Sequence, residues 1–383
     1  MWEIRRDELI PAIRILDMVG SRPGIPSSGS FLLEQMPNSN GSRNYIKIST
    51  AASAVAEVGL TGTGTWPLRR PFYADRGIFS PFVNVAKEMK NKNRFQSYLK
   101  SGNLHIDHGN RYEDFLPQPS VMGYARLPKF KVKPNRLNLT PELLEMMKCA
   151  ATCAASELQA PHLSCVYMVP TTKGVSLYAT NLKVVFKASA AVELGEEVND
   201  AIPFPLSIID AAGADGVKSV LWAEDCAIAK FPGGRIWQTV SEQARTGFPV
   251  NEIRSSLEKG TKDLNVFSVS AYKFAKMVDR LTQYLQSVRK EDWVIVILST
   301  QNANALSVLI KLPHVTIREK IGTLEPVKRD FRLEWPLDMI APVLQFVGKD
   351  EEQIPLRVGL EMDGLNSHIR CGKIRMTVPS KAM

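Results

Sequence analysis

The sequence predicts an α+β fold built from three repeated units, each with two helices packed on antiparallel strands. Three observations lead to this prediction. Amphipathic helical patterns recur along the 383 residues, and each is followed after about 65 residues by a second helical pattern. Segments of alternating apolar residues, bounded by Gly, Asn and Pro, fill the intervals between them. A hairpin pattern closes each repeat, so we expect units of about 125 residues at 1–128, 129–260 and 261–383.

The first helix of each unit is predicted from apolar residues that recur at intervals of three and four. Asp7 is expected to cap the first of these helices. Thr140 is expected to cap the second, with Pro141 at its first helical position. The predicted helices cover residues 7–20, 140–154 and 270–288.

The helix at 270–288 divides into two faces. Its polar stripe contains three cations and then neutral residues, and no acid of the helix interrupts it. A stripe of this kind suits contact with polyphosphate, although a solvated surface is the usual role of a charged helix face. The stripe consists of Lys273, Lys276, Arg280, Gln283 and Ser287, and the buried face of Phe274, Met277, Val278, Leu281, Leu285 and Val288.

The second helices are expected to begin at Asp75, Pro203 and Glu334. Alternating patterns predict strands before and after each of them, including one strand over 175–190 that follows a turn at 172–174. Polar and Pro-containing segments predict linkers between the units at 124–138 and 255–265.

The net charge of +9 favours an anionic partner, nucleic acid first and an acidic membrane surface second. No run of about 18 apolar residues is present, so no membrane-spanning helix is expected. The charged start MWEIRRDELIP does not fit a signal peptide, which favours a cytosolic protein. Five cysteines without paired spacing are expected to be reduced and buried. Cys149 and Cys153 lie one helical turn apart, but no second cysteine pair follows, so zinc is not expected.

No motif for catalysis, metal binding or cofactor binding is recognisable in the sequence. The stretch TGTGTW at 61–66 lacks the Gly-Lys-Ser/Thr of a phosphate loop, and a turn at a strand end is expected there. His105 and His108 flank a predicted hairpin turn and are expected to be solvated. We therefore expect a protein that is not an enzyme. An enzyme whose site is assembled from distant residues is the alternative that the sequence leaves open.

Several local motifs accompany the threefold plan. They are the opening strand followed by RDEL and a helix, the loop Gly20-Ser21-Arg22-Pro23, the hairpin LHIDHGNRYEDF, the stretch LYATN and the terminal KIRMTVP. In their order and spacing, over essentially the whole chain, they resemble the bacterial DNA polymerase III beta subunit, the DNA sliding clamp. Clamps of this family are usually acidic, so the charge of +9 points to a divergent member, phage-encoded or otherwise.

The resemblance implies that two chains join head to tail and that their six clamp units close a ring around duplex DNA. Twelve helices would line the hole and contact phosphates without reading sequence. The linker lysines 129, 131 and 133 would lie outside the ring. Arg22 matches a DNA-contacting arginine that precedes a proline in the family. The expected DNA-binding residues are Arg14, Arg22, Lys87, Lys148, Lys273, Lys276 and Arg280.

The resemblance also implies a hydrophobic pocket for short peptides from DNA polymerase, the clamp loader and other proteins with a clamp-binding motif. The C-terminal residues 376–383 are expected in this pocket. The family's Thr-Asp-Gly-His-Arg stretch is replaced here by Thr180-Asn181-Leu182-Lys183-Val184, so the peptide preference is expected to differ. The positions that match the pocket are Leu163, Thr180, Pro249, Met376, Val378 and Pro379.

The sequence thus predicts a processivity factor that is cytoplasmic, nucleoid-associated and homodimeric, with no membrane partner. The rival from another class is a basic repeat protein that binds nucleic acid, or serves as a scaffold, without closing a ring.

Overall fold

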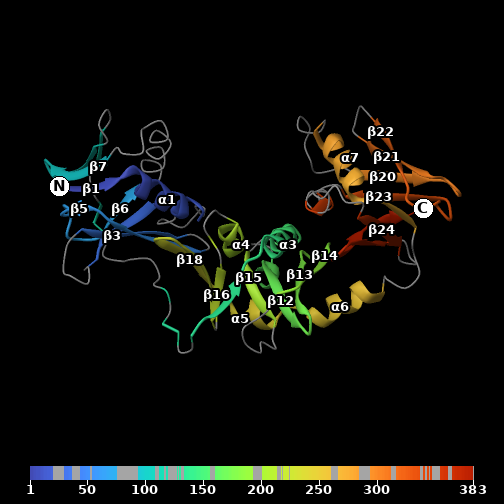
Figure 1. The fold of residues 1–383 in the computed structure, drawn as a ribbon, viewed down its shortest axis with the longest axis horizontal. Coiled ribbons are helices and arrows are strands. Elements are labelled where there is room, and N and C mark those ends of the chain that lie inside the picture. Colours follow the sequence, from blue (N-terminus) through green and yellow to red (C-terminus); the bar gives the residue numbers. More distant parts are fainter. Residues whose placement is uncertain are drawn as a thin grey trace. The chain divides into compact units, whose positions relative to one another are not determined.

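The computed structural model describes residues 1–19, 30–36, 44–51, 54–75, 94–107, 112–115, 118–119, 127, 129–130, 133–155, 160–192, 201–213, 217, 219–223, 225–259, 266–283, 294–311, 316–336, 340, 343–344, 346, 354–360 and 365–382. The chain divides into two compact units. Unit 1 comprises Met1–Leu139 with Ser207–Val240, and unit 2 comprises Thr140–Leu206 with Ser241–Met383. Both units combine helices with antiparallel sheets (Figure 1), which confirms the α+β prediction.

Unit 1 contains a five-stranded sheet of order β5-β1-β7-β8-β9 and a nine-stranded sheet of order β10-β6-β2-β3-β4-β18-β17-β16-β11. The first sheet consists of β1 (Trp2–Arg5), β5 (Thr63–Gly64), β7 (Arg94–Lys100), β8 (Asn103–Asp107) and β9 (Tyr112–Phe115). The second consists of β2 (Ser30–Gln35), β3 (Tyr45–Ala51), β4 (Val55–Thr61), β6 (Phe72–Asp75), β10 (Gln118–Pro119), β11 (Asn135–Asn138), β16 (Ser219–Ala223), β17 (Cys226–Phe231) and β18 (Gly234–Thr239).

Helix α1 (Arg6–Asp17) packs its apolar face on β4 and β18 of unit 1. Ile13 and Leu16 on that face are completely buried. The expectation that Asp7 caps this helix was wrong. Arg5 occupies the N-cap position, and its guanidinium Nε donates to the Asp7 carboxylate at 2.9 Å in the first turn. The helix α4 (Leu206–Ala212) is held near β18 by a hydrogen bond from the Ser207 hydroxyl to Gln238.

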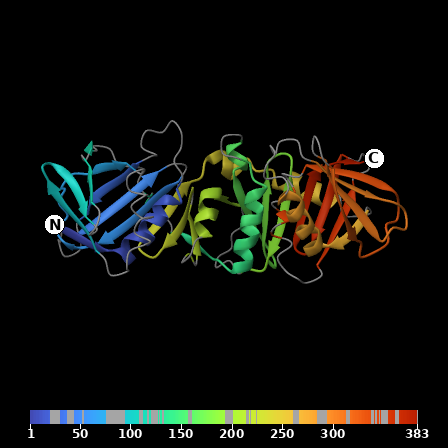
Figure 2. The same ribbon diagram turned by 90° about the horizontal axis from the view of Figure 1, so that it is seen from above.

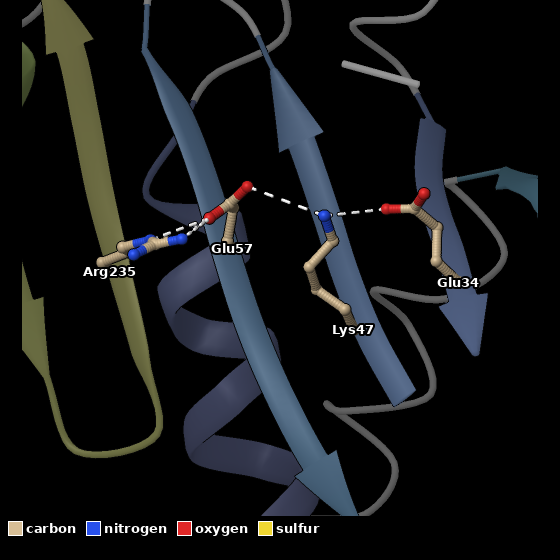
Figure 3. Close-up of polar contacts among 4 residues, drawn as sticks. All are labelled: Glu34, Lys47, Glu57 and Arg235. Atoms are coloured by element: carbon tan, nitrogen blue, oxygen red, sulfur yellow. Dashed lines mark hydrogen bonds and ion pairs between the residues drawn. The ribbon is translucent and has the colours of Figure 1, made fainter. Parts of the chain in front are cut away.

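A line of alternating charges crosses four strands of the nine-stranded sheet (Figure 3). Lys47 Nζ on β3 lies 2.8 Å from the Glu34 carboxylate on β2 and 3.8 Å from that of Glu57 on β4. Arg235 on β18 lies 2.7 Å from the other oxygen of Glu57. Opposite charges on neighbouring strands stabilise a sheet, so this line helps to join β18 to β4.

Unit 2 contains an eight-stranded sheet of order β15-β12-β13-β14-β26-β25-β24-β19 and a five-stranded sheet of order β22-β21-β20-β23-β27. The first consists of β12 (Cys165–Thr171), β13 (Gly174–Thr180), β14 (Val185–Ala190), β15 (Ile202–Pro205), β19 (Phe267–Ser270), β24 (Pro355–Leu360), β25 (Asn366–Cys371) and β26 (Ile374–Pro379). The second consists of β20 (Val294–Ser299), β21 (Ala305–Lys311), β22 (Thr316–Gly322), β23 (Phe331–Pro336) and β27 (Lys381–Ala382).

The helices of unit 2 pack on both of its sheets. Helix α3 (Pro141–Thr152) packs on β12, β13 and β14 (Figure 2), and α7 (Ala271–Gln283) contacts β22. The short helices η1 (Pro161–Leu163) and α5 (Glu242–Thr246) contact each other, and α6 (Val250–Lys259) contacts β14 and β26. Thr140 caps α3 as predicted, because its hydroxyl accepts a hydrogen bond from the Leu143 amide at 3.1 Å.

Two strand pairs connect segments that the sequence assigns to different repeats. β4 pairs with β18 in unit 1, and β14 pairs with β26 in unit 2. Both pairs are antiparallel, so in each case the sheet continues from one predicted repeat into the next. This is the edge-to-edge joining that three repeats would need to protect their open sheet edges. The boundaries at 128 and 260 remain a prediction.

Several predicted elements differ in the structure. The helices predicted to start at Pro203 and Glu334 are preceded by strands β15 and β23, because pairing with β12 and β20 outweighs local helix preference. Residues 255–259 belong to α6 and not to a linker, since Ile253 and Leu257 bury one helical face. The strand predicted over 175–190 is two strands separated by a turn. The helix predicted from Asp75 lies largely outside the described residues.

Candidate functional site

Helix α7 has the two faces that its sequence predicts. Phe274, Met277, Val278 and Leu281 are at most 2% exposed, and this face packs in unit 2 with the Phe274 ring edge-on to Trp335. Lys273, Lys276 and Arg280 are all exposed. Leu285, Val288 and Ser287 lie outside the described residues, as does the side chain of Gln283.

The cations of this stripe are not equivalent. Arg280 forms a two-bond contact with Glu319 of β22, with one nitrogen 2.6 Å and the other 3.4 Å from the carboxylate oxygens. The neighbouring strand β22 therefore supplies an acid to a stripe that has none of its own. Among the described residues, neither Lys273 nor Lys276 has an acidic partner, and Lys276 Nζ lies 5.7 Å from the centroid of the Tyr272 ring. These two lysines are the free positive charges of α7.

The other predicted DNA-binding residues fall on different elements. Arg14 is exposed in the last turn of α1 in unit 1, and Lys148 is half-buried on α3 in unit 2. Arg22 and Lys87 lie outside the described residues. Of the linker lysines, Lys129 and Lys133 are exposed. Cations thus occupy the first helix of each predicted repeat.

The six predicted peptide-pocket residues all belong to unit 2, but they do not share one surface. Thr180 pairs with Val185, which pairs with Thr377, so these three side chains lie on one face of the sheet. Pro379 follows two residues after Thr377 on the same face. Met376 and Val378 point to the opposite face, where they are 2% and 0% exposed.

Leu163 and Pro249 lie near two stacked aromatic side chains, Tyr167 and Phe248. Leu163 ends η1 and is buried, and Pro249 is half-buried before α6. Tyr167 of β12 stacks on Phe248 with ring centroids 3.6 Å apart. The Tyr167 hydroxyl donates to the carbonyl of Ala244 at 2.7 Å and also contacts the carbonyl of His162. Burial raises the pKa of Tyr167, so this hydroxyl stays protonated and holds η1 beside α5.

Comparison with solved structures gives matches over the full chain. The DNA polymerase sliding clamp of Bacillus subtilis is 13% identical with a TM-score of 0.74, covering 99% of this chain and 98% of the clamp. The beta subunit from DNA polymerase of Streptococcus pyogenes is 12% identical with a TM-score of 0.72, covering 99% of both chains. The DNA polymerase III subunit beta of Pseudomonas aeruginosa is 10% identical with a TM-score of 0.73, also covering 99% of both.

The chain has the sliding-clamp fold. By sequence alone, no family model matches and no curated protein matches. This chain therefore adopts the clamp fold although about nine in ten of its residues differ from those at the matching positions of the solved clamps.

The C-terminal strand of this clamp-fold chain has a structural position that the sequence did not predict. Residues 376–383 were expected to lie in the peptide pocket. However, β26 is an interior strand between β14 and β25, and Lys381–Ala382 pair with β23 as an edge strand. β26 therefore contributes to the core of unit 2 through Met376 and Val378.

The turn between β13 and β14 contains Asn181-Leu182-Lys183-Val184, the residues after Thr180 for which the sequence predicts a different peptide preference. The Thr180 hydroxyl donates to the carbonyl of Val184 at 2.7 Å. The Asn181 side chain accepts from the amides of Lys183 at 3.0 Å and Val184 at 2.8 Å. Leu182 adopts a positive φ of 72° and is 78% exposed. An exposed leucine thus lies on a hydrogen-bonded turn next to Thr180.

In the part of the chain that the structure describes, no group of three or more His, Cys, Asp or Glu side chains could hold a metal ion. All five cysteines are buried free thiols, and burial raises the pKa of Cys153, Cys226 and Cys371 to about 12. Such thiols are poor nucleophiles near neutral pH.

Two histidines are buried in the structure. The expectation that His105 is solvated was wrong, because it is 4% exposed and its ring lies 4.7 Å from that of Tyr98. His368 is also buried, with Nδ1 3.0 Å from the Thr377 hydroxyl. His108 lies outside the described residues. Within the described residues, no helix is both long and apolar enough to span a membrane.

The sequence did not single out Tyr167, Phe248 or Glu319. Phe248 lies next to Pro249 and before an amphipathic segment, and this pattern could have indicated the site that Tyr167 and Phe248 form. Glu319 could not be found from the sequence, because the contact joins residues 39 positions apart on different elements.

Proposed function

We propose that this protein is a DNA sliding clamp, a non-enzymatic processivity factor that encircles duplex DNA as a head-to-tail homodimer. The observation that carries the proposal is the likeness of 99% of the chain to solved DNA polymerase sliding clamps. The cations on α1, α3 and α7 support it, since they suit contacts to phosphate that carry no sequence information.

We further propose that partner proteins bind unit 2 through short peptides. The partners would be a DNA polymerase, a clamp loader and other proteins with a clamp-binding motif. Leu163 and Pro249 support this proposal by their position next to the Tyr167–Phe248 stack, and Thr180 and Pro379 support it by their shared face of the eight-stranded sheet. A clamp of this kind would act in the cytoplasm, on the nucleoid.

Ring closure is the property that tests the proposal. Analytical ultracentrifugation is expected to give a dimer, and electron microscopy is expected to show a closed particle with a central hole. When a clamp loader of the same replication system places the protein on a circular plasmid, it should remain bound until the plasmid is cut. Loss on linearisation follows because a ring held by topology slides off free ends.

The net charge of +9 favours a second candidate, a basic nucleic-acid-binding or scaffold protein that closes no ring. The same experiments separate the two functions. A strictly monomeric protein that dissociates equally from circular and linear DNA would support the second and contradict the clamp.

A further inference from the structure

The eight-stranded sheet of unit 2 carries an unbalanced row of positive charge. Lys187 on β14 pairs with Arg375 on β26, which pairs with Arg370 on β25, which in turn pairs with Arg357 on β24. Directly opposite residues project from the same face of a sheet, so the four cations form one line, which we name the cation row. Arg357 and Arg370 are exposed, and Lys187 and Arg375 are half-buried.

The sheet supplies no acid to balance this row. The eight strands contain no Asp or Glu within their bounds, and the four residues of the row are the only Lys or Arg in them. Among the described residues, Arg357, Arg370 and Arg375 make no ion pair or side-chain hydrogen bond. Lys187 makes no ion pair with a described residue either, and its Nζ lies 5.5 Å from the centroid of the Tyr178 ring.

The nine-stranded sheet of unit 1 shows the opposite arrangement. There Lys47 and Arg235 alternate with Glu34 and Glu57, as Figure 3 shows. Like charges on directly opposite residues destabilise a sheet, whereas opposite charges stabilise it. The cation row therefore costs folding stability, and an anionic partner that binds it would relieve this cost.

We propose that the cation row binds an acidic, extended segment of a partner protein. With neighbouring strands about 4.8 Å apart, the row is about 14 Å long, which matches about four residues of extended peptide. Guanidinium groups bind carboxylates through two parallel hydrogen bonds, and three of the four cations are arginines.

The surroundings of the row favour a peptide over nucleic acid. Single-stranded nucleic acid is bound by stacking of its bases on exposed aromatic rings. The aromatic residues in register with the row are Tyr178 and Tyr167, which are 1% and 0% exposed. A single row of four cations also offers fewer phosphate contacts than the six to ten, approximately, that a duplex-binding protein commonly makes.

The position of the row gives a further reason. It lies on the same face as Thr180, Thr377 and Pro379. Thr377 and Pro379 follow Arg375 by two and four residues along β26. Thr180 follows Tyr178, which is in register with the row, by two residues along β13. A peptide that reaches the candidate pocket could thus place an acidic flank over the row. This last argument rests on the proposed peptide site, whereas the row itself does not.

Fluorescence anisotropy with a labelled peptide of eight glutamates tests the proposal. The wild-type protein should bind this peptide at low salt, and Arg370→Gln/Arg375→Gln should weaken binding by about tenfold, since two charge pairs with the peptide are lost. The control variant Arg318→Gln/Lys320→Gln removes two exposed cations of β22 in the same unit and should leave binding unchanged. An oligothymidylate with eight phosphates should bind more weakly than the peptide.

A charge reversal separates binding from folding. Arg375→Glu places an acid between Lys187 and Arg370, much as Glu57 lies between Lys47 and Arg235. Its melting temperature should equal or exceed that of the wild type, while its affinity for the peptide falls.

The proposal is overturned if the row variants bind the glutamate peptide as tightly as the wild type, or if the β22 variant loses as much affinity. It is also overturned if the oligothymidylate binds the row more tightly than the peptide does, which would make the row a nucleic-acid site. The row variants are expected to leave ring closure and retention on circular DNA unchanged. A failure of the peptide-binding proposal can therefore be distinguished from a failure of the proposed clamp function.

Discussion

Lys273 and Lys276 differ from Arg280 in the charge around them, although all three are exposed on one face of α7. Glu319 already neutralises Arg280 in the free protein, and binding a phosphate there would require breaking a contact of 2.6 Å. No such contact holds the two lysines among the described residues. We therefore expect the lysines to provide most of the phosphate binding by α7.

The double variant Lys273→Gln/Lys276→Gln tests this difference. It should lower the affinity for duplex DNA and reduce the slope of log affinity against log salt by about 2, because about 0.9 of a unit is lost per phosphate contact. Adding Arg280→Gln should change the slope by less than a further unit. The measurement is a salt titration of DNA binding by fluorescence anisotropy.

The control is Lys129→Gln/Lys133→Gln, which removes the same charge from two exposed lysines that we place outside the ring. An equal loss of slope in both double variants would mean that net charge, and not the position of α7, determines DNA binding.

At the scale of single residues, the sequence predicted which side chains of α7 are buried, but not which acidic side chain Arg280 contacts. Phe274, Met277, Val278 and Leu281 were identified correctly because a helix repeats its face every three to four residues. The partner of Arg280 was not predictable, because the strand that carries Glu319 reaches α7 only through the tertiary fold.

Helix α3 shows how a local signal can determine the start of an element. Thr140 at the cap and Pro141 at the first position agree with the structure because both act through the helix's own backbone. Asp7 failed as a cap because β1 continues to Arg5 and leaves no extended position beyond it.

Thr140→Ala should remove the capping hydrogen bond to the Leu143 amide and lower the free energy of unfolding by about 1 kcal/mol. Thr140→Ser keeps the hydroxyl and should restore most of the loss. Urea denaturation followed by circular dichroism measures both. Equal destabilisation by Ala and Ser would show that the methyl group of Thr140, and not its hydroxyl, provides the stabilisation.

The elements that the sequence missed are those defined by pairing. β15 and β23 include Pro203 and Glu334, the positions at which the apolar spacing predicts that helices begin. Their conformation is set by hydrogen bonds to β12 and β20, which are distant in the sequence. The candidate peptide residues illustrate the same limit, since the assignment of Val378 to the pocket did not reveal that its side chain points into the core.

At the scale of the whole molecule, the interior position of β26 determines which experiments on the C-terminus are informative. Deleting residues 376–383 would remove most of an interior strand of the eight-stranded sheet, including the buried Met376 and Val378. We expect unit 2 to unfold in this variant, so loss of peptide binding would not identify a pocket residue.

Deleting only residues 381–383 is the matched control. It removes the edge strand β27 and leaves β26 paired on both sides. This variant should keep a cooperative thermal transition, whereas the longer deletion should lack the transition of unit 2. Differential scanning calorimetry distinguishes the two, and a folded 376–383 deletion would contradict the interior position of β26.

At this scale the plan of three repeats rests on the helix spacing along the chain, and it remains a prediction. The division into two compact units was not predictable, because it depends on the sheet that β18 completes.

The pairing of β18 with β4 also limits how this protein can be dissected. A fragment that ends at residue 128 would leave the edge of β4 uncovered, with the apolar Ala56 and Val58 beside unsatisfied backbone groups. Such edges attract other strands, and the fragment is expected to aggregate during expression. Residues 207–240 complete the sheet, but residues 140–206 separate them from the rest of unit 1 in the sequence. A stable isolated unit 1 would therefore require a redesigned connection, such as a circular permutation or a direct fusion of residue 139 to residue 207.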